Sequence, residues 1–360
     1  MTRATFEISY QAIANKDSDD AADALQLLKT FAFLHCENIR FEFLEKAVTN
    51  AALELQQQAE DKKREAGSKA HDGPQTWSKW WNTVVFSLLT YLYRTRTPLV
   101  LPDVLRQGRE QKRFSESRHG TANGPLVIYN HTRDSYSMHL LVHEWAREAP
   151  DMSIGEQGVW SEATSVLLSS CILLPPLGNT TKDEDIRKDL LPHVDHVREV
   201  QACIADRMKD KRMARMKPWP VFESGFNRER ALMYAKFSIV YSQNDRWEDA
   251  KRLQMAVKEF TLKFLGIYHP VTRRIMLPLA GTLFHLGHSD EAAALHEQSL
   301  GRSRYLQGRL SEARKLQEEA VARLQKLHGL DNEATLDAVD NVGRTTVNFY
   351  REEDFRRARS

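Results

Sequence analysis

Three segments in the last third of the chain repeat one pattern, and this repetition constrains the fold more than any other feature. The segments "WEDAKRLQMAV", "SDEAAALHEQSL" and "SEARKLQEEAV" begin at Trp247, Ser289 and Ser311. Each has a small alanine followed three residues later by a leucine, with an aromatic residue eight or nine positions before the alanine. A small residue where two helices touch, with an aromatic beside it, is what stacked helical hairpins require. The predicted packing residues are Tyr241, Ala250, Phe284, Ala292, Tyr305 and Ala313.

The spacing between these segments is irregular at one place. Ala250 and Ala292 are 42 residues apart, whereas Ala292 and Ala313 are only 21 apart. Two connectors, "LGIYHPVT" at Leu265–Thr272 and "HGLDNEAT" at His328–Thr335, also resemble each other, and each has a glycine suited to a helix C-terminus. About one helix is therefore missing near "EQSLGRSRYLQGR". We expect either that one helix serves two repeats or that the array changes direction.

These residues resemble tetratricopeptide repeats (TPRs) of the 42-residue kind found in kinesin light chains. The resemblance covers residues 229–360 and rests on the alanine, the aromatic residue and the glycine-containing connector. It implies a superhelix of helix pairs with a concave groove that binds a peptide, and no catalysis. In that family the first helix of each pair lines the groove, where cations can bind carboxylates of an extended partner peptide. The groove candidates on or near the predicted first helices are Lys236, Asn244, Arg273, Arg274 and Arg344.

The last residues, "FYREEDFRRARS", resemble the turn and the first residues of a further second helix. No polar capping helix follows them, although the ends of solenoids usually need one. We therefore expect a short array of three to four irregular repeats that binds a protein partner and can self-associate through its uncapped end.

The composition is that of an ordinary soluble protein. The 360 residues are 41% hydrophobic and 28% charged, and 51 basic against 49 acidic residues give a net charge of +2. This balance provides no field that would drive binding to nucleic acid or membranes. The longest apolar runs have about 13 residues, whereas a membrane span needs about 20. The N-terminus lacks a signal-peptide pattern, so we expect a cytoplasmic protein. We also expect that it needs no cofactor.

A second resemblance lies in the middle of the chain. "MHLLVHEWA", residues 138–146, resembles the motif that ends the winged-helix part of NB-ARC nucleotide switches. Those switches are the engines of NOD-like immune receptors in plants, and relatives in filamentous fungi often carry TPRs. Residues 5–35 are similar to the helical segment that precedes the winged helix, and residues 190–197 to the bridge into the fungal repeats. The resemblance implies that His139 corresponds to a histidine that contacts the nucleotide phosphates.

One motif of that family is absent from this sequence. A P-loop, GxxxxGK[ST], cradles the phosphates with backbone amides and reaches them with its lysine, and no such string occurs in the 360 residues. The chain therefore resembles the C-terminal half of such a receptor without its motor. We expect no ATP binding or hydrolysis by the chain alone.

Together the patterns predict a mainly α fold, in which a helical, winged-helix-like N-terminal module is followed by a short TPR α-solenoid. Short strands are expected at "PLVIYN" and "SYSM". The predicted segments are 1–60 (helical), 61–124 (an irregular insert with a helical patch), 125–150 (the end of the winged helix), 151–224 (a helical bridge) and 225–360 (the TPR-like repeats).

The two histidines of the central motif leave three alternatives open. His139 and His143 are four residues apart and would share one face of a helix, as in zinc proteases. In HExxH the glutamate follows the first histidine, whereas Glu144 follows the second and lies about 140° round the helix from His139. A core stripe at helical spacing is predicted for Met138, Leu141, Val142 and Trp145. Packing, a phosphate-facing His139 and a metal site are therefore all possible.

The remaining reactive side chains favour no catalytic chemistry. Cys36, Cys171 and Cys203 are odd in number and widely spaced, so they predict reduced, buried thiols and no disulfide framework. His193 and His196 are expected to face solvent or a neighbouring helix. No GxSxG nucleophile motif occurs.

The sequence thus predicts a non-catalytic scaffold segment of a receptor-like NB-ARC–TPR switch that lacks its P-loop. One alternative is a stand-alone TPR adaptor similar to kinesin light chain. The other is a metal-dependent hydrolase that uses His139 and His143.

Overall fold

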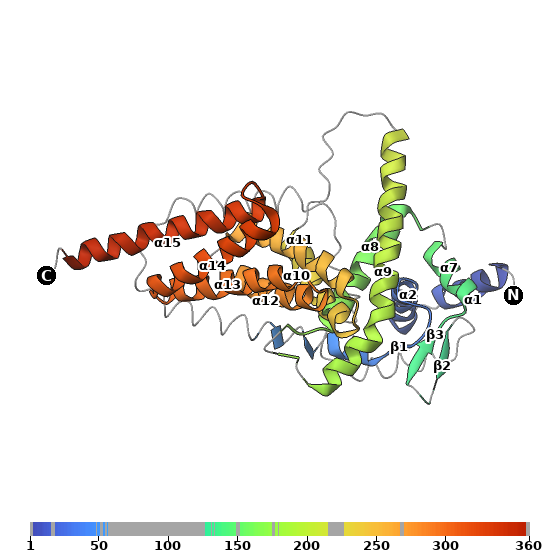
Figure 1. The fold of residues 1–360 in the computed structure, drawn as a ribbon. Coiled ribbons are helices and arrows are strands. Elements are labelled where there is room, and N and C mark those ends of the chain that lie inside the picture. Colours follow the sequence, from blue (N-terminus) through green and yellow to red (C-terminus); the bar gives the residue numbers. More distant parts are fainter. Residues whose placement is uncertain are drawn as a thin grey trace. The chain divides into compact units, whose positions relative to one another are not determined.

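The computed structural model shows a mainly α-helical chain that divides into two compact units, residues 1–220 and 221–360 (Figure 1). The predicted insert at 61–124 lies outside the described residues. Within the part of the chain that is described, no helix is long and apolar enough to cross a membrane. The structure describes residues 3–15, 19–47, 49, 50, 53, 54, 56, 127–130, 132, 134–148, 152–174, 177, 178, 180–214, 227–266 and 270–357.

The first unit is built from helices and a small sheet. Its longest helix, α9, packs against α8, and α2 packs against both α7 and α8. Helix α8 begins with a capping box, in which the Glu156 backbone N–H donates to Ser153 Oγ and the Ser153 N–H donates to the Glu156 carboxylate. The described helices are α1 (Arg3–Ala14), α2 (Asp19–Phe31), α7 (Leu140–Glu148), α8 (Ile154–Ser170) and α9 (Thr181–Ala214).

The sheet is antiparallel, with strand order β1-β3-β2. The two predicted strands form a ribbon, β2 (Ile128–Asn130) and β3 (Ser135–Ser137), in which Tyr129 pairs with Tyr136. The third strand, β1 (Ile39–Arg40), was not expected, because two residues are too short to show an alternating pattern. Tyr136 is buried at the centre of the sheet.

The core of the first unit is apolar, and the three thiols lie at different depths around it. Cys171 is buried, as predicted, and its Sγ donates to the Phe43 carbonyl oxygen at 3.0 Å. The expectation of three buried thiols is wrong for the other two, since Cys36 is partly buried and Cys203 is exposed on α9. The apolar side chains with the least exposure include Phe33, Leu34, Ile39, Phe43, Leu167, Leu168, Leu190 and Val194.

The second unit is a stack of helices in which each packs against the next in chain order. This is the TPR-like helical solenoid predicted from the repeated segments. Helix α15 continues through "FYREEDF" to Arg357 (Figure 1), so the turn expected there is wrong. The helices are α10 (Arg228–Gln243), α11 (Trp247–Leu265), α12 (Pro270–His285), α13 (Ser289–Leu306), α14 (Leu310–His328) and α15 (Glu333–Arg357).

Three turns of this unit share one geometry and define the repeat register. The backbone N–H of Arg246, His288 and Arg309 donates to the carbonyl five residues earlier, at 3.0, 2.9 and 2.9 Å. The residue before each donor has a positive φ: 57° at Asp245, 83° at Gly287 and 74° at Gly308. The turn before α14 is therefore equivalent to the turns before α11 and α13.

Helix α13 accounts for the irregular spacing. Its start carries Ala292, the alanine of a second helix, while its end leads into the same turn that ends a first helix. It packs against both α12 and α14. One helix therefore serves two repeats, which is one of the two arrangements that the sequence left open.

The register also corrects one predicted packing residue. The carbonyls of Tyr241, Leu283 and Arg304 accept the equivalent turn hydrogen bonds, and each lies nine residues before its alanine. Leu283 is buried against Ala292, whereas Phe284 is 62% exposed. Phe284 therefore does not pack between helices, because it lies one residue beyond the buried position.

The other predicted packing residues are buried or partly buried. Tyr241, Ala250, Ala292 and Ala313 are buried at helix contacts. Tyr305 is partly buried, and its hydroxyl accepts a hydrogen bond from the Asn348 amide of α15.

Candidate binding pocket in the repeat unit

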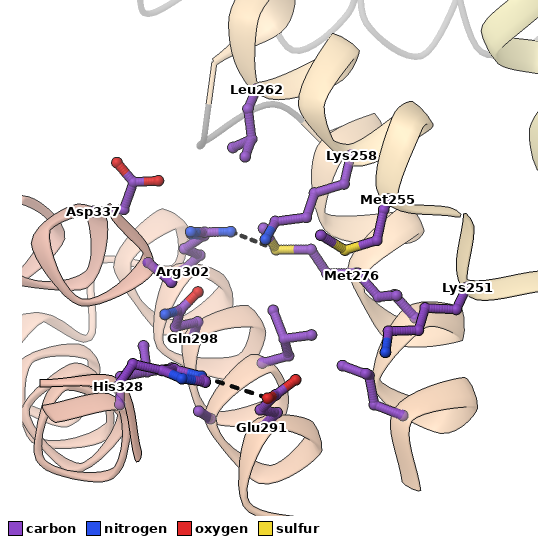
Figure 2. A pocket seen from close by; sticks show the side chains of 16 residues that line it. Lys251, Met255, Lys258, Leu262, Met276, Glu291, Gln298, Arg302, His328 and Asp337 are labelled. Atoms are coloured by element: carbon purple, nitrogen blue, oxygen red, sulfur yellow. Dashed lines mark hydrogen bonds and ion pairs between the residues drawn. The ribbon is translucent and has the colours of Figure 1, made fainter. Parts of the chain in front are cut away.

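A pocket of about 240 Å³ lies within the repeat unit and is lined by residues from α11 to α15 (Figure 2). Its inner surface is largely apolar, with Leu279 and Leu283 of α12 and Leu295 of α13 among the contributors. Charged side chains from three of the helices surround this surface. The pocket thus combines an apolar interior with a charged border, as ligand sites commonly do.

One wall comes from a single stripe of α11. Lys251, Met255, Lys258 and Leu262 are four, three and four residues apart, which places them on one helix face. This spacing alternates an ammonium group with an apolar side chain along the wall. An extended ligand along α11 would therefore meet a cation and an apolar contact in turn.

The floor of the pocket is α13, and its deepest charged residue is Arg302. The Arg302 side chain is only 2% exposed, and its Nη1 lies 2.6 Å from Met276 Sδ (Figure 2). Gly301 allows α14 to approach closely beside it, since a Cβ at this glycine would lie 2.9 Å from Gln317 Cγ. A guanidinium is thus held within the helix stack.

The charges that line the pocket sum to a positive value. The lining has three cations, Lys251, Lys258 and Arg302, and two carboxylates, Glu291 and Asp337. His328 Nε2 lies 3.5 Å from Glu291 Oε1. A carboxylate is therefore the ligand group that this border favours.

The predicted groove residues lie elsewhere. Lys236 is buried on α10, Arg274 is exposed on α12, and the Asn244 amide donates to the Val240 carbonyl at 2.8 Å. Arg344 of α15 pairs with Asp340 at 2.8 Å. None of these four lines the pocket, and the side chain of Arg273 lies outside the described ones.

The two lysines of the pocket come from α11, a second helix, whereas Arg302 lies in the half of α13 that serves as a first helix. The lysines of α11 could have been found from their spacing with Met255 and Leu262. Arg302 could not, because its burial depends on the close packing of α13 and α14.

The central histidine motif does not form the predicted pair. Helix α7 begins at Leu140, so His139 lies before the helix, where its Nδ1 accepts the Leu141 N–H at 3.3 Å. His143 is buried, with its Nε2 2.7 Å from the Leu34 carbonyl oxygen. The two side chains therefore do not share a helix face. The predicted core stripe is present at Met138, Val142 and Trp145, but Leu141 is exposed.

His143 instead belongs to a cluster of four histidines in the first unit. Its ring lies 5.1 Å from that of His196, and the His35 ring lies 6.2 Å from the rings of both His193 and His196. His193 is fully buried between the His35 N–H and the Asn38 carbonyl, so the expectation that it faces solvent or a neighbouring helix is wrong. The structure brings these rings together from a loop, α7 and α9.

Burial lowers the pKa of three members of this cluster: to about 4 for His143 and His196 and to about 3 for His193. The charged forms are disfavoured because the rings lack water, and Arg147 lies beside His196 at 3.2 Å. The rings of His35, His143 and His193 bond backbone groups, and the His196 ring pairs with Arg147. Among the described residues, no group of three or more His, Cys, Asp or Glu side chains is arranged to hold a metal ion.

Among known protein families, a match is found within the repeat unit. Residues 299–333, from the second half of α13 to the start of α15, match the tetratricopeptide repeat family. No curated protein and no solved structure matches the chain. The matched residues include the turn at Gly308, the packing residue Ala313 and the connector at Gly329, so the similarity to a tetratricopeptide repeat covers the end of the shared helix α13 and all of α14.

Proposed function

We propose that the repeat unit binds an extended segment of a partner protein, and that its pocket receives an apolar side chain next to a carboxylate. Tetratricopeptide repeats generally mediate protein–protein binding, and residues 299–333 match that family. The single observation that carries the proposal is the pocket lined by α11 to α15, in which buried Arg302 and two lysines border an apolar interior.

The size of the pocket favours a side chain over a whole small-molecule substrate. At about 240 Å³ it lies below the roughly 300–1,000 Å³ of typical small-molecule sites. Lys251 and Lys258 are seven residues apart on α11, or about 10 Å along the helix axis. Two carboxylates separated by a few residues of an extended peptide would span that distance.

The experiment selects short random peptides on the intact chain and measures the affinity of the recovered peptides by fluorescence polarisation. We expect enrichment of peptides with an Asp or Glu close to a large apolar residue. Lys258→Glu should weaken these peptides by about tenfold or more, because a like charge would face the ligand carboxylate. Lys263→Glu is the matched control, since Lys263 is exposed on α11 and does not line the pocket.

Equal losses in the two lysine variants would contradict a role for the pocket. Selection of peptides without acidic residues would contradict the proposed ligand chemistry. Circular dichroism of both variants checks that the helices are intact.

We further propose that the chain is a scaffold segment of a receptor-like switch of the NB-ARC–TPR kind, with residues 1–60 and 125–150 as the helical and winged-helix-like module and residues 151–224 as a bridge. The support is the order of the resembling segments along the sequence. His139 is exposed before α7, where a nucleotide phosphate could reach it. A stand-alone adaptor similar to kinesin light chain is the alternative. Because the sequence contains no P-loop, calorimetric titration with ADP should give no binding to this chain.

The hydrolase alternative lacks structural support. It needs His139 and His143 to bind one metal ion, but His143 is turned to the Leu34 carbonyl and His139 precedes the helix.

A further inference from the structure

The outward face of α15 carries a continuous apolar stripe. Leu336, Val339, Val347 and Tyr350 are between 45% and 59% exposed, although the opposite face of the helix is buried against its neighbours. Gly343 lies in the middle of the stripe, and a Cβ there would meet nothing within 4 Å. Tyr350 remains exposed even though its hydroxyl interacts with Arg314 of α14.

The stripe is symmetric about Gly343. Val339 and Val347 lie four residues before and after this glycine, and Leu336 and Tyr350 lie seven residues before and after it. Offsets of four and seven keep all five residues on one helix face. An antiparallel copy of α15, related by a two-fold axis through Gly343, would therefore place Val339 on Val347 and Leu336 on Tyr350. The glycine at the axis lets two helices approach closely.

The charges beside the stripe fit the same arrangement. Asp337 and Asp340 lie before Gly343, whereas Arg344 and Arg351 lie after it, all on one flank of the stripe. In an antiparallel pair this flank faces its own copy, so the acidic half of one helix meets the basic half of the other. Asp340 and Arg344 of the copy would be offset by about two residues, or about 3 Å along the axis. The Asp340–Arg344 pair within each helix, at 2.8 Å, would then become part of a four-residue network.

We propose that this face of α15 is a dimerisation surface, on which two copies of the chain pair antiparallel about Gly343. The stripe covers 15 residues, Leu336–Tyr350, or about 21 Å of helix. One pair of helix faces of this length forms a small interface, because standard interfaces bury roughly 1,200–2,000 Å² over 20–30 residues a side. We therefore expect a reversible dimer, with a Kd on the order of micromolar.

Sedimentation velocity of the full chain over a concentration series tests the surface. The wild-type chain should shift from monomer to dimer as its concentration rises through the micromolar range. Val347→Glu should raise the dimer Kd by about tenfold or more, because two carboxylates enter the apolar contact. The matched control is Leu277→Glu on α12, which replaces a similarly exposed leucine outside the stripe and should leave the Kd unchanged.

A charge reversal tests the orientation. Asp340→Arg alone should weaken the dimer, because arginines would then face each other across the axis. The double variant Asp340→Arg with Arg344→Asp should restore the dimer, since opposite charges again meet between the copies. In a parallel pair the same flanks do not face each other, so no rescue would occur.

Disulfide crosslinking tests whether the two-fold axis passes through Gly343. It does not depend on the folding of the charged variants. Gly343→Cys places two thiols on the two-fold axis, so mild oxidation should produce a covalent dimer. Arg351→Cys places them about 24 Å apart and should produce no more dimer than the wild-type chain, which has its own cysteines. A chain that stays monomeric at high micromolar concentration, or that crosslinks equally at both positions, would overturn the proposal. Lys258→Glu leaves α15 unchanged, so loss of peptide binding and loss of the dimer are separable.

Discussion

His143, His193 and His196 are neutral at physiological pH because burial removes the water that would solvate their charged forms. Their pKa values lie well below the ordinary 6.5 in the folded chain. The unfolded chain therefore binds more protons than the folded chain at any pH between about 6.5 and the folded values. Protons thus favour unfolding of the first unit over this range.

We predict that the free energy of unfolding of the first unit is highest above pH 6.5 and falls as the pH drops towards about 4. Between pH 7 and pH 5, one histidine whose pKa falls from 6.5 to about 4 contributes a loss of about 2 kcal/mol. The three rings interact, so the total loss should be less than the sum of three such terms. Urea unfolding at pH 7 and pH 5 measures this difference.

A substitution assigns the effect to the cluster. His143→Gln removes one titrating ring but keeps an amide that can donate to the Leu34 carbonyl, so the loss between pH 7 and pH 5 should shrink. His296→Gln, at an exposed position of α13, should leave the pH dependence unchanged. If both variants follow the wild-type pH profile, the cluster is not its source.

The roles of these histidines could not be predicted from the sequence. The spacing of His139 and His143 correctly indicated a nearby helix with an apolar stripe, but the helix begins one residue after His139. The partners of His143 and His193 are the carbonyls of Leu34 and Asn38, more than a hundred residues away. Local spacing contains no information about such partners.

At the scale of elements, the repeat unit depends on α13 serving as both a second and a first helix. Its first half packs Ala292 against Leu283 of α12, and its second half packs Gly301 against α14. The irregular spacing of the alanines was sufficient to predict this shared helix as one of two arrangements. The sequence did not show that the sharing brings Arg302 into the floor of a pocket, because that depends on where three helices meet.

We predict that Gly301→Ala destabilises the repeat unit by about 1–3 kcal/mol, because its Cβ would lie 2.9 Å from Gln317 Cγ and 3.3 Å from the Ala313 carbonyl oxygen. Gly281→Ala in α12 is the matched control, since a Cβ there meets nothing within 4 Å. That substitution should stabilise by about 0.5–1 kcal/mol through helix propensity. Urea unfolding measures whether each substitution lowers or raises the free energy of unfolding. If Gly301→Ala raised it, α14 would be able to move away from the added Cβ without a loss of stability.

Phe284 shows how accurately a repeat pattern can predict which side chains are buried. The alanines and the glycine connectors were located correctly because turns and helix contacts restrict the residue type there. An aromatic eight residues before the alanine could not be told from a leucine nine residues before it, since both suit an apolar position. The hydrogen-bond register of the turn decides between them in favour of Leu283.

At the scale of the whole molecule, the chain is two compact units with separate cores. The first unit depends on the buried rings of α7 and α9, and the second on small residues between consecutive helices. Low pH should therefore destabilise the first unit, whereas substitutions at helix contacts should destabilise the second. This separation can be measured without any ligand.

We predict two unfolding transitions in differential scanning calorimetry, which respond to different changes. Lowering the pH from 7 to 5 should lower the Tm of the transition that belongs to the first unit, because its histidines gain protons on unfolding. Gly301→Ala should lower the Tm of the other transition by about 3–10 °C and leave the first unchanged. A single transition that moves with both changes would mean that the two units unfold together, and the cores would then not be independent.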